Sequence, residues 1–421
     1  MTENVIWPVE RRRTRRRGFG VARFVLRSLG AMRYGSLAIR MPDGEVLRFG
    51  DGSNPRGSRH GLDAAFTIRD YDFFRRCFFF GDIGFGESYV VGDWETDDLA
   101  EVVAWFILND EQQTGRTTKR ILNSLGWLNN AVHRLRSNTE SGSRANIAAH
   151  YDLSNAFFRL FLDPSMTYSS AWFERADMPL DEAQIAKYER VCRLIELESS
   201  DRLLEIGGGW GAFSRYAAKK YGCHVTTITI SRQQFEWADR LRREERLEGQ
   251  IDLLLADYRR ITGRFDKIVS IEMLEAVGHD YFGVFFAKCA EVLAPNGLAA
   301  VQVITCPDWR CESMRRGVDF IQKHIFPGGE VPSIGCLVRA ISGATDFSVR
   351  DLFDFGDSYA RTLQLWAAAF EANLDAVRRL GFDESFIRKW RYYLRYCQAA
   401  FLMRHISVAQ MLLSRSNSQL I

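Results

Sequence analysis

One stretch, residues 202–213 (Arg-Leu-Leu-Glu-Ile-Gly-Gly-Gly-Trp-Gly-Ala-Phe), constrains the fold of this chain more than any other. Its first half is a short apolar run that predicts the end of a buried strand, and the residues from Ser214 onward predict a helix. Gly207, Gly209 and Gly211 make the turn between the two, where backbone N–H groups can approach a ligand closely. The stretch therefore predicts a nucleotide-binding turn at the N-terminus of a helix.

Two kinds of nucleotide fit this turn. With Ala212, the stretch matches the dinucleotide pattern G-x-G-x-x-[G/A]. Glu205, however, stands at the strand end and suits a cationic ligand, such as the sulfonium and ammonium groups of S-adenosylmethionine. The next strand ends in Thr229-Ile-Ser231, without the acidic residue that the ribose of a nicotinamide dinucleotide requires. We therefore predict S-adenosylmethionine.

The pattern from residue 148 onward alternates strand and helix, which predicts an α/β fold with a largely parallel sheet. Strands are expected near 202–206, 223–229, 251–255, 266–271 and 298–304, with two late strands near 347–353 and 406–413. A helical insertion is expected over 310–345, and long helices over 358–380 and 384–403. This is the layout of the seven-stranded, Rossmann-like sheet of class I S-adenosylmethionine-dependent methyltransferases.

The sequence divides into four predicted segments. They are a basic amphipathic arm (1–33), a smaller α+β N-terminal domain associated with lipid (34–115), a helical linker (116–147) and the catalytic domain (148–421). Within the N-terminal domain we expect a hairpin over 36–49, a strand over 64–68 and a helix over 99–108. The aromatic run 71–80 is interpreted as core, and the glycine-rich run 81–87 as a loop.

Charge is spread unevenly along the chain. The net charge is only +3 over 421 residues, yet the first 40 residues hold ten arginines and two acids. Val21, Val25, Leu29 and Met32 recur at helical spacing, which indicates a short basic helix able to lie on a membrane surface. Such an arm favours an anionic partner, either phospholipid headgroups or nucleic acid. We predict a phospholipid bilayer and no nucleic acid.

Cysteine, histidine and hydropathy patterns limit the remaining possibilities. The eight cysteines show no C-x-x-C spacing and the seven histidines no H-x-x-x-H pair, so no metal site is expected. Such cysteines are typical of reduced thiols in a cytosolic protein. No apolar run approaches the length of a membrane span. The predicted location is cytoplasmic, with peripheral association to the inner face of the membrane. A homodimer is a further expectation that the sequence leaves open.

A series of ordered motifs runs through the second half of the chain. The motifs are His150-Tyr-Asp-Leu-Ser154, Tyr168-Ser-Ser-Ala-Trp-Phe173, Glu205-Ile-Gly-Gly-Gly-Trp-Gly211, Thr229-Ile-Ser231 with Gln234, Glu275-Ala-Val-Gly278, Ile325-Phe-Pro-Gly-Gly329 and Phe355-Gly-Asp-Ser-Tyr359. Through them the chain resembles the cyclopropane-fatty-acyl-phospholipid synthase family, which includes the mycolic acid cyclopropane synthases. Residues 34–110 resemble, more weakly, the N-terminal domain of the bacterial phospholipid enzymes.

The resemblance implies transfer of a methylene group from S-adenosylmethionine to the cis double bond of a phospholipid acyl chain, which gives a cyclopropane fatty acid. An alkene is a poor nucleophile and must be held in line with the methyl donor in a dry site. Aromatic faces can stabilise the carbocation that follows. A base must then remove a proton from the transferred methyl group.

In that family the base is bicarbonate, held by a Glu, a Tyr, a His, a Cys and a backbone group. The resemblance assigns these roles to Glu275, Tyr359 and the backbone of Ile304. Two positions depart from the pattern, because Ser170 replaces the Cys and Gln302 replaces the His. Both can still hydrogen-bond an anion, so bicarbonate is expected in an altered site.

The resemblance also assigns the cofactor residues. They are Tyr168, Ser169, Glu205, Gly207, Gly208, Gly209, Trp210, Gly211, Thr229, Ser231, Gln234, Asp257 and Tyr258. Cys397 matches a family cysteine once regarded as catalytic, although its place on an amphipathic helix is also typical of an inert buried thiol.

Three alternatives to the cyclopropane product stay open. The altered base site would also suit a C-methyltransferase that makes a methyl-branched acyl chain. A small-molecule N-methyltransferase is the second alternative, although it would not need a basic arm or an N-terminal domain. The third is a nucleic-acid-binding protein on a decayed transferase scaffold, against which the intact glycine turn argues.

Overall fold

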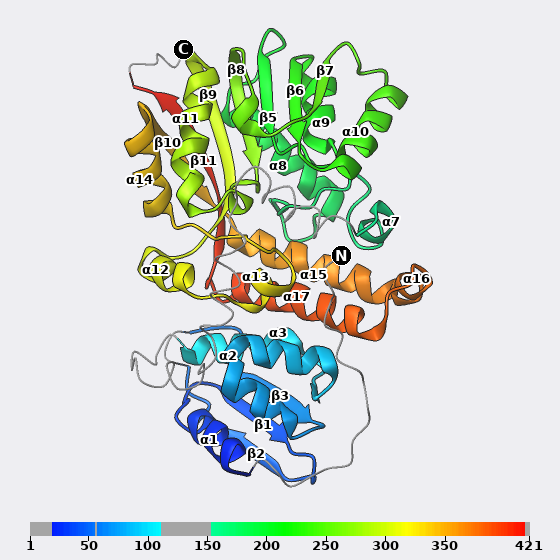
Figure 1. Cartoon of the computed structure of the whole chain (residues 1–421), viewed down its shortest axis with the longest axis vertical. Helices are drawn as coiled ribbons and strands as arrows, with labels where there is room; N and C mark the ends of the chain where they lie inside the picture. The colour runs from blue at the N-terminus through cyan, green and yellow to red at the C-terminus, as the bar shows by residue number, and fades with distance from the viewer. Residues whose placement is uncertain (1–18, 55–56, 111–152, 417–421) are drawn as a thin grey trace.

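The computed structural model describes residues 19–54, 57–110 and 153–416 (Figure 1). The first 18 residues of the predicted basic arm and the whole predicted helical linker (116–147) lie outside the described residues, as do His150 and Tyr151. Within the described ranges, no helix is long and apolar enough to cross a bilayer.

The C-terminal domain is built on one seven-stranded sheet. Its strands are β5 (Arg202–Ile206), β6 (His224–Thr229), β7 (Ile251–Leu255), β8 (Phe265–Ile271), β9 (Leu293–Thr305), β10 (Phe347–Asp354) and β11 (Ser407–Arg415). Their order is β10-β11-β9-β8-β5-β6-β7. Strand β11 runs antiparallel to both of its neighbours, and the other pairs are parallel. The predicted seven-stranded α/β sheet, including both late strands, is confirmed.

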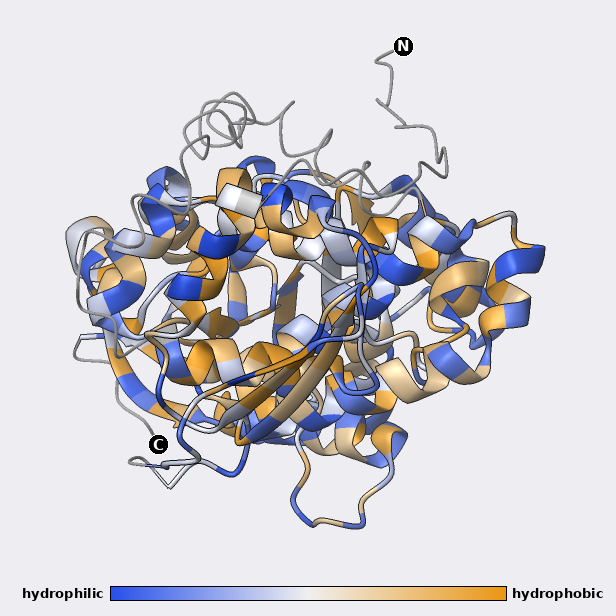
Figure 2. Cartoon of the chain, turned by 90° about the horizontal axis from the view of Figure 1, so that it is seen from below, coloured by the Kyte–Doolittle hydropathy of each residue, from blue (hydrophilic) through white to orange (hydrophobic). Residues whose placement is uncertain are grey.

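The strands carry apolar side chains on both faces of this sheet, and helices cover both faces and bury these side chains. Leu203 belongs to the apolar cluster that joins the sheet to α8 (Leu180–Leu194) and α9 (Ala212–Tyr221). Leu204 belongs to the cluster with α11 (Phe282–Val292) and α14 (Ile334–Ala344) on the other face. Helix α10 (Arg232–Glu244) packs beside β6 and β7. Figure 2 shows that helices around the sheet carry both hydrophobic and hydrophilic residues.

The strand order reverses at β5. Strand β6 pairs with β5 on one side and β8 pairs with it on the other. The chain connections therefore leave β5 in opposite directions along the sheet, and the turn after Ile206 opens into the crevice between them. Ligands of open α/β sheets bind at such a switch point, beyond the carboxyl ends of the strands. The glycine turn lies at this point.

A layer of helices separates the sheet from the N-terminal domain (Figure 1). It consists of α15 (Gly356–Ala372), α16 (Leu374–Arg379) and α17 (Glu384–Leu402), with the short helices α7 (Asn155–Phe158), α12 (Asp308–Arg316) and α13 (Phe320–His324) at its edges. Side chains of α15 and α17, among them Trp366 and Trp390, share one apolar core with Phe66 and Trp94 of the N-terminal domain.

Within residues 19–54 and 57–110, the N-terminal domain consists of a four-stranded sheet and three helices. Its strands are β1 (Ser36–Arg40), β2 (Val46–Phe49), β3 (Asp63–Ile68) and β4 (Trp94–Glu95), in the order β2-β1-β3-β4, and its helices are α1 (Phe19–Leu29), α2 (Asp72–Val91) and α3 (Leu99–Asp110). The antiparallel pair β1–β2 confirms the predicted hairpin. Phe73 and Phe74 are buried, as expected of core.

The loop predicted over 81–87 is wrong. These residues lie inside α2, which kinks at Gly81 (φ 57°, ψ −128°) and continues to Val91. The later glycines serve close packing, since a Cβ atom at Gly86 would lie 2.4 Å from the Phe320 ring. Glycine is as typical of a tight helix contact as of a loop, and sequence spacing does not separate the two.

The membrane-facing role predicted for the apolar side of the first helix is also wrong. Val25 and Leu29 of α1 are 7% and 6% exposed, because α1 packs onto α2. The rings of Phe24 and Phe78 meet edge to face at 5.4 Å in this contact. An amphipathic period is the same for a helix on a protein core and for a helix on a bilayer.

Candidate active site

A cavity of about 870 Å³ opens beyond the carboxyl ends of β5, β6, β8 and β9. It passes the helical layer and reaches α1, α2 and α3 of the N-terminal domain, where Val25, Phe73 and Phe106 contribute to its wall. Most of its lining is apolar or aromatic, with one group of polar residues at the strand ends and another around Asp319 and Gln322 on α13. Such a cavity suits a long apolar substrate that reacts at one polar end of the space.

Most of the residues predicted to bind the cofactor line the strand-end half of this cavity. They are Tyr168, Ser169, Glu205, Gly207, Gly208, Gly209, Trp210, Thr229, Gln234, Asp257 and Tyr258. The other two shape helices instead, because Gly211 is the N-cap of α9 and Ser231 the N-cap of α10. Thr229 and Gln234 hydrogen-bond to each other (Oγ1 to Oε1, 2.8 Å), and Asp257 is paired with Arg259.

The glycine turn leaves its open side toward the cavity. Gly207 and Gly209 have positive φ angles of 88° and 53°. A Cβ atom at Gly208 would lie 2.0 Å from the Thr227 hydroxyl, whereas one at Gly209 would meet nothing within 4 Å. Gly209 therefore borders the space that the cofactor needs.

Gly209→Val is expected to abolish most cofactor binding, because it places a branched side chain in this space and strains a left-handed backbone. Titration calorimetry with S-adenosylhomocysteine should show at least about a ten-fold loss of affinity. Gly222→Ala is the matched control, since Gly222 also has a positive φ (73°) but ends α9. Unchanged affinity in a folded Gly209→Val protein would contradict this placement of the cofactor.

Glu205 is buried at the end of β5, with 3% exposure. Its carboxylate accepts a hydrogen bond from Thr227 Oγ1 at 2.6 Å. Burial raises the pKa of Glu205 to about 7, although hydrogen bonds from Thr227 and Ser214 and the Lys187 charge oppose the shift. A cationic ligand beside this carboxyl group would favour its ionised form, which suits a sulfonium or ammonium group.

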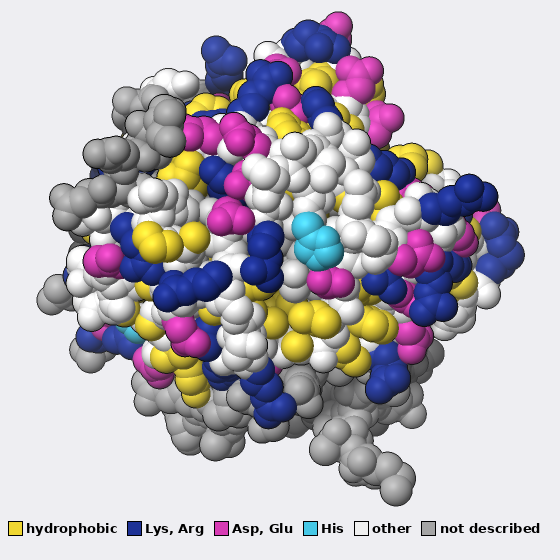
Figure 3. All heavy atoms as spheres, turned by 90° about the horizontal axis from the view of Figure 1, so that it is seen from above, with side chains coloured by type: hydrophobic (Ala, Val, Ile, Leu, Met, Phe, Trp, Pro, Cys, Tyr) yellow, Lys and Arg dark blue, Asp and Glu magenta, His cyan; other side chains and the backbone are white. Residues whose placement is uncertain are grey.

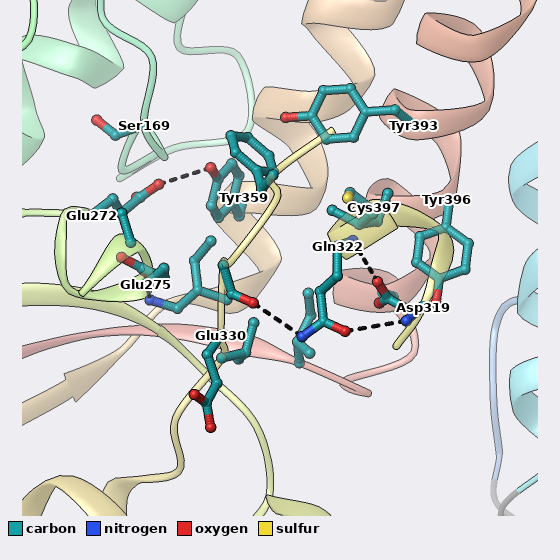
Figure 4. A pocket seen from close by; sticks show the side chains of 18 of the residues that line it. Ser169, Glu272, Glu275, Asp319, Gln322, Glu330, Tyr359, Tyr393, Tyr396 and Cys397 are labelled. Atoms are coloured by element: carbon teal, nitrogen blue, oxygen red, sulfur yellow. Dashed lines mark hydrogen bonds between the residues drawn. The ribbon is translucent and has the colours of Figure 1, made fainter. Parts of the chain in front are cut away.

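The polar centre of the site is Glu272, directly after β8. Its carboxylate accepts three hydrogen bonds, and Figure 4 shows the one from Tyr359. The donors are Ser170 N (2.8 Å), Gln302 Nε2 (2.7 Å) and the Tyr359 hydroxyl (2.8 Å). Glu272 has a φ of 49°, a left-handed conformation that is uncommon for such a residue and that clusters at functional sites.

Glu275 lies one turn further along and is bonded differently. Its Oε1 atom accepts from the backbone N–H of Ile304, and its buried Oε2 atom has no partner within the described residues. Burial, and then the charge of Glu272, raise the pKa of Glu275 to about 8. Burial also raises the pKa of Glu272, but Lys187 and the three donors oppose it. The three donors on Glu272 favour its ionised form, whereas Glu275, with a pKa of about 8, is neutral near pH 7.

The arrangement differs from the bicarbonate site that the sequence predicts. Tyr359 donates to Glu272 and not to Glu275. Ser170 offers its backbone N–H, since its hydroxyl donates to the Ala171 carbonyl (2.8 Å). Gln302 is held in place by Gln410, whose Nε2 donates to its Oε1 at 2.9 Å. Because these donors are all engaged by a carboxylate, and a second carboxyl group lies beside it, a bicarbonate ion does not fit.

Cys397 lies on another wall of the cavity, on α17 beside Tyr396 and Asp319 (Figure 4). Burial raises the pKa of its thiol, which keeps it protonated. The rings nearer the two acids come from several elements. Tyr359 stacks obliquely on Phe401 at 4.4 Å, and Tyr168 lies 5.3 Å from Trp366 and hydrogen-bonds to Tyr393.

None of the sequence motifs above assigns a role to Glu272, Gln184 or Lys187. The chain itself gave one signal for Glu272, an acid at the carboxyl end of a central strand, but the same signal applies to Glu275. The positive φ that turns the Glu272 side chain toward Tyr359 is not visible in the sequence.

The sheet order, the glycine turn at its switch point and the buried acid at the end of β5 together define an S-adenosylmethionine-dependent methyltransferase. The chain belongs to the mycolic acid cyclopropane synthetase family, whose model matches residues 138–411.

Curated relatives support this membership over most of the chain. The chain is 34% identical to tuberculostearic acid methyltransferase UfaA1 of Mycobacterium tuberculosis over 380 residues, 88% of this chain and 87% of that protein. It is 35% identical to cyclopropane-fatty-acyl-phospholipid synthase of Escherichia coli over 391 residues, 90% of this chain and 95% of that protein.

Solved structures agree with the C-terminal fold. The cyclopropane synthase MmaA2 of Mycobacterium tuberculosis superposes with a TM-score of 0.61 at 34% identity, over 65% of this chain and 98% of that one. Mycolic acid cyclopropane synthase CmaA1, solved with S-adenosylhomocysteine, gives 0.60 at 35% identity, over 65% and 98%. The chain thus modifies lipid acyl chains with S-adenosylmethionine as its methyl donor.

Proposed function

We propose that this enzyme transfers a one-carbon unit to the cis double bond of an unsaturated acyl chain in a membrane phospholipid, and that Glu272 is the base of the reaction. The observation that carries the proposal is the placement of the Glu272 carboxylate on Ser170 N, Gln302 and Tyr359. These are three of the groups that the family resemblance assigns to a bicarbonate base. A carboxylate of the chain thus stands where a diffusible anion was expected.

Bound S-adenosylmethionine supplies an electrophilic methyl group on a sulfonium. The apolar cavity holds the acyl chain and excludes water, so that the double bond meets this methyl group without competing solvent. When the alkene attacks, positive charge develops on the acyl chain, and the aromatic rings of Tyr168, Tyr359 and Phe401, which line the same cavity, can stabilise it. Glu272 then accepts a proton from the transferred methyl group, as the electrons of that C–H bond close the cyclopropane ring.

A second candidate product is a methyl-branched acyl chain. The observation that favours it is the departure of this site from the cyclopropane synthase pattern at Ser170, Gln302 and Glu272, together with the similarity to a tuberculostearic acid methyltransferase. In that case Glu272 removes a proton after a hydride shift and leaves an exocyclic methylene group, which a separate reductase would have to saturate.

One experiment tests the substrate class and separates the products. The purified enzyme is incubated with vesicles of oleoyl phospholipid and with methyl-labelled S-adenosylmethionine, and the fatty acids are released and analysed by mass spectrometry. A labelled cyclopropane acid supports the first product, and a labelled methylene-bearing acid supports the second. Label that appears only on an added alkaloid amine would contradict both and favour the N-methyltransferase alternative.

The basic arm is proposed to bring the enzyme to anionic lipid. On the face in Figure 3, basic and acidic side chains are interspersed, so this face offers no purely basic surface to a bilayer. The first 40 residues, by contrast, hold ten arginines and two acids. Each arginine near an anionic surface contributes ~1 kcal/mol to binding, and salt screens the effect.

Replacement of the six arginines in residues 11–17 by glutamine is therefore expected to weaken vesicle binding. Sedimentation with anionic vesicles at low salt should show at least about a ten-fold loss of affinity. Replacement of the same six residues by lysine keeps the charge and should keep the binding. Equal binding of the unaltered enzyme to neutral and anionic vesicles would contradict the proposal, and tight RNA binding would favour the nucleic-acid alternative.

A further inference from the structure

Helix α8 buries two polar side chains that neither the fold nor the reaction above requires. Lys187 is 0% exposed and Gln184 is 1% exposed. The two stand three residues apart and therefore point from the same side of the helix. Burial of an ammonium group costs several kcal/mol unless charges or hydrogen bonds compensate it, so the contacts of this pair are informative.

Both side chains hydrogen-bond to Ser169. Lys187 Nζ donates to Ser169 Oγ at 2.7 Å, and Gln184 Nε2 donates to the Ser169 carbonyl at 3.0 Å. The other Gln184 amide atom, Oε1, is buried without a partner within the described residues. Among the described residues, the Gln184 side chain thus makes this one hydrogen bond.

The contact with Ser169 leads directly to Glu272. The Ser169 carbonyl and the Ser170 N–H belong to one peptide group, and this N–H donates to Glu272 Oε1 at 2.8 Å. A donor on the carbonyl side polarises the peptide group and strengthens the hydrogen bond that its N–H makes. Gln184 therefore acts on Glu272 through a single peptide group.

Lys187 also lies among the buried acids of the site. Carboxylates of Glu272, Asp163 and Glu205, from three different segments, favour its ammonium form, while burial lowers its pKa to about 7. Its own helix adds the Tyr188 ring, 4.5 Å from Nζ. In turn, the Lys187 charge is the largest influence opposing the burial that raises the pKa of Glu272.

We propose that Gln184 and Lys187 are positioning residues, which together hold the Ser169–Ser170 peptide so that its N–H meets Glu272 and keep the Glu272 carboxylate ionised. The proposal rests on the proposed function, in which Glu272 is the base. It assigns to α8 a role in the protonation state of a group with which Gln184 and Lys187 make no direct hydrogen bond.

The test is the pH profile of turnover in Lys187→Met, a variant of similar side-chain length without charge. Loss of a nearby cation raises the pKa of a carboxyl group, so the acid limb of the kcat profile should move up by on the order of one pH unit. Turnover near that limb should then fall about ten-fold, because one unit changes the ionised fraction about ten-fold. Lys187→Arg keeps the charge and should leave the limb in place.

Gln184→Met provides a second arm that does not depend on the charge. It removes the donor to the Ser169 carbonyl with little change in volume, and we expect kcat to fall several-fold while KM for phospholipid stays unchanged.

Lys220→Met is the matched control for Lys187→Met, because Lys220 is a half-exposed lysine of α9 that is paired with Glu189. It should keep both turnover and the acid limb.

The outcomes separate this proposal from the proposed function. An acid limb that stays in place in Lys187→Met, or turnover that falls equally at every pH, would overturn the role of Lys187, and wild-type kcat in Gln184→Met would overturn that of Gln184. If Lys187→Met does not fold, Gln184→Met alone decides. Full activity in Glu272→Gln would instead overturn Glu272 as the base, whatever the α8 variants show.

Discussion

Glu272→Gln is expected to lower turnover on unsaturated phospholipid by about 10²–10⁴-fold, the usual cost of removing a positioned base. Glutamine keeps the shape of the side chain, and its amide oxygen can still accept from Ser170 N and Gln302 Nε2, while its NH2 group faces the Tyr359 hydroxyl, which can accept from it; the site should therefore stay assembled. It cannot take a proton. Single-turnover kinetics with the purified variant, together with calorimetry of S-adenosylhomocysteine binding, should therefore show lost chemistry and retained cofactor affinity.

Glu275→Gln is the matched control for this experiment. Because burial and the neighbouring Glu272 hold Glu275 neutral near pH 7, its amide replacement mimics the state already present. We expect a loss below about ten-fold, from the weakened contact with the Ile304 N–H. A large loss in Glu275→Gln beside normal turnover in Glu272→Gln would reverse the assignment and restore Glu275 as the residue next to the base.

Glu272→Gly is expected to be as inactive as Glu272→Gln but to recover when a small anion is added. The substitution empties the space between Ser170 N, Gln302 and Tyr359, and glycine adopts the φ of 49° without strain. Formate or bicarbonate can then accept the same hydrogen bonds and act as a base. Added at tens of millimolar, they should raise turnover by at least about ten-fold, a part of the 10²–10⁴-fold that a positioned base supplies.

Two comparisons make the rescue specific. Chloride at equal ionic strength should not restore turnover, since it is a negligible base. Glu272→Gln should not respond to formate, because its side chain still fills the space. Rescue of Glu272→Gln to the same extent as Glu272→Gly would show that the anion acts elsewhere and would contradict the placement of the base.

The fold could be predicted from the sequence because its signals are local and repeated. Each strand of the C-terminal sheet is a short apolar run between helical segments, and the glycine turn after Ile206 fixes which strand stands at the switch point. The two failures in the N-terminal domain arose where one pattern fits two environments. Gly84 and Gly86 of α2 and the apolar face of α1 both satisfy contacts that come from other parts of the chain.

The site was predicted in outline, and its centre was missed for a similar reason. The family pattern identified Tyr359, Gln302 and Ser170, which do converge, but it centred them on an external anion beside Glu275. The donors converge on Glu272 because its left-handed backbone angle and the length of its side chain bring the carboxylate within reach of all three. Neither the angle nor the convergence is encoded by residue type or spacing.

The apolar core that joins the N-terminal domain to α15 and α17 has a consequence for how the chain unfolds. Ile39 and Phe66 on one side and Trp366 and Trp390 on the other are fully or almost fully buried in one cluster. Two parts that share a core lose their stability together, so calorimetric melting should give a single cooperative transition instead of two. Proteolytic removal of the N-terminal domain would expose the apolar side of α17 to water, and the remaining fragment should aggregate.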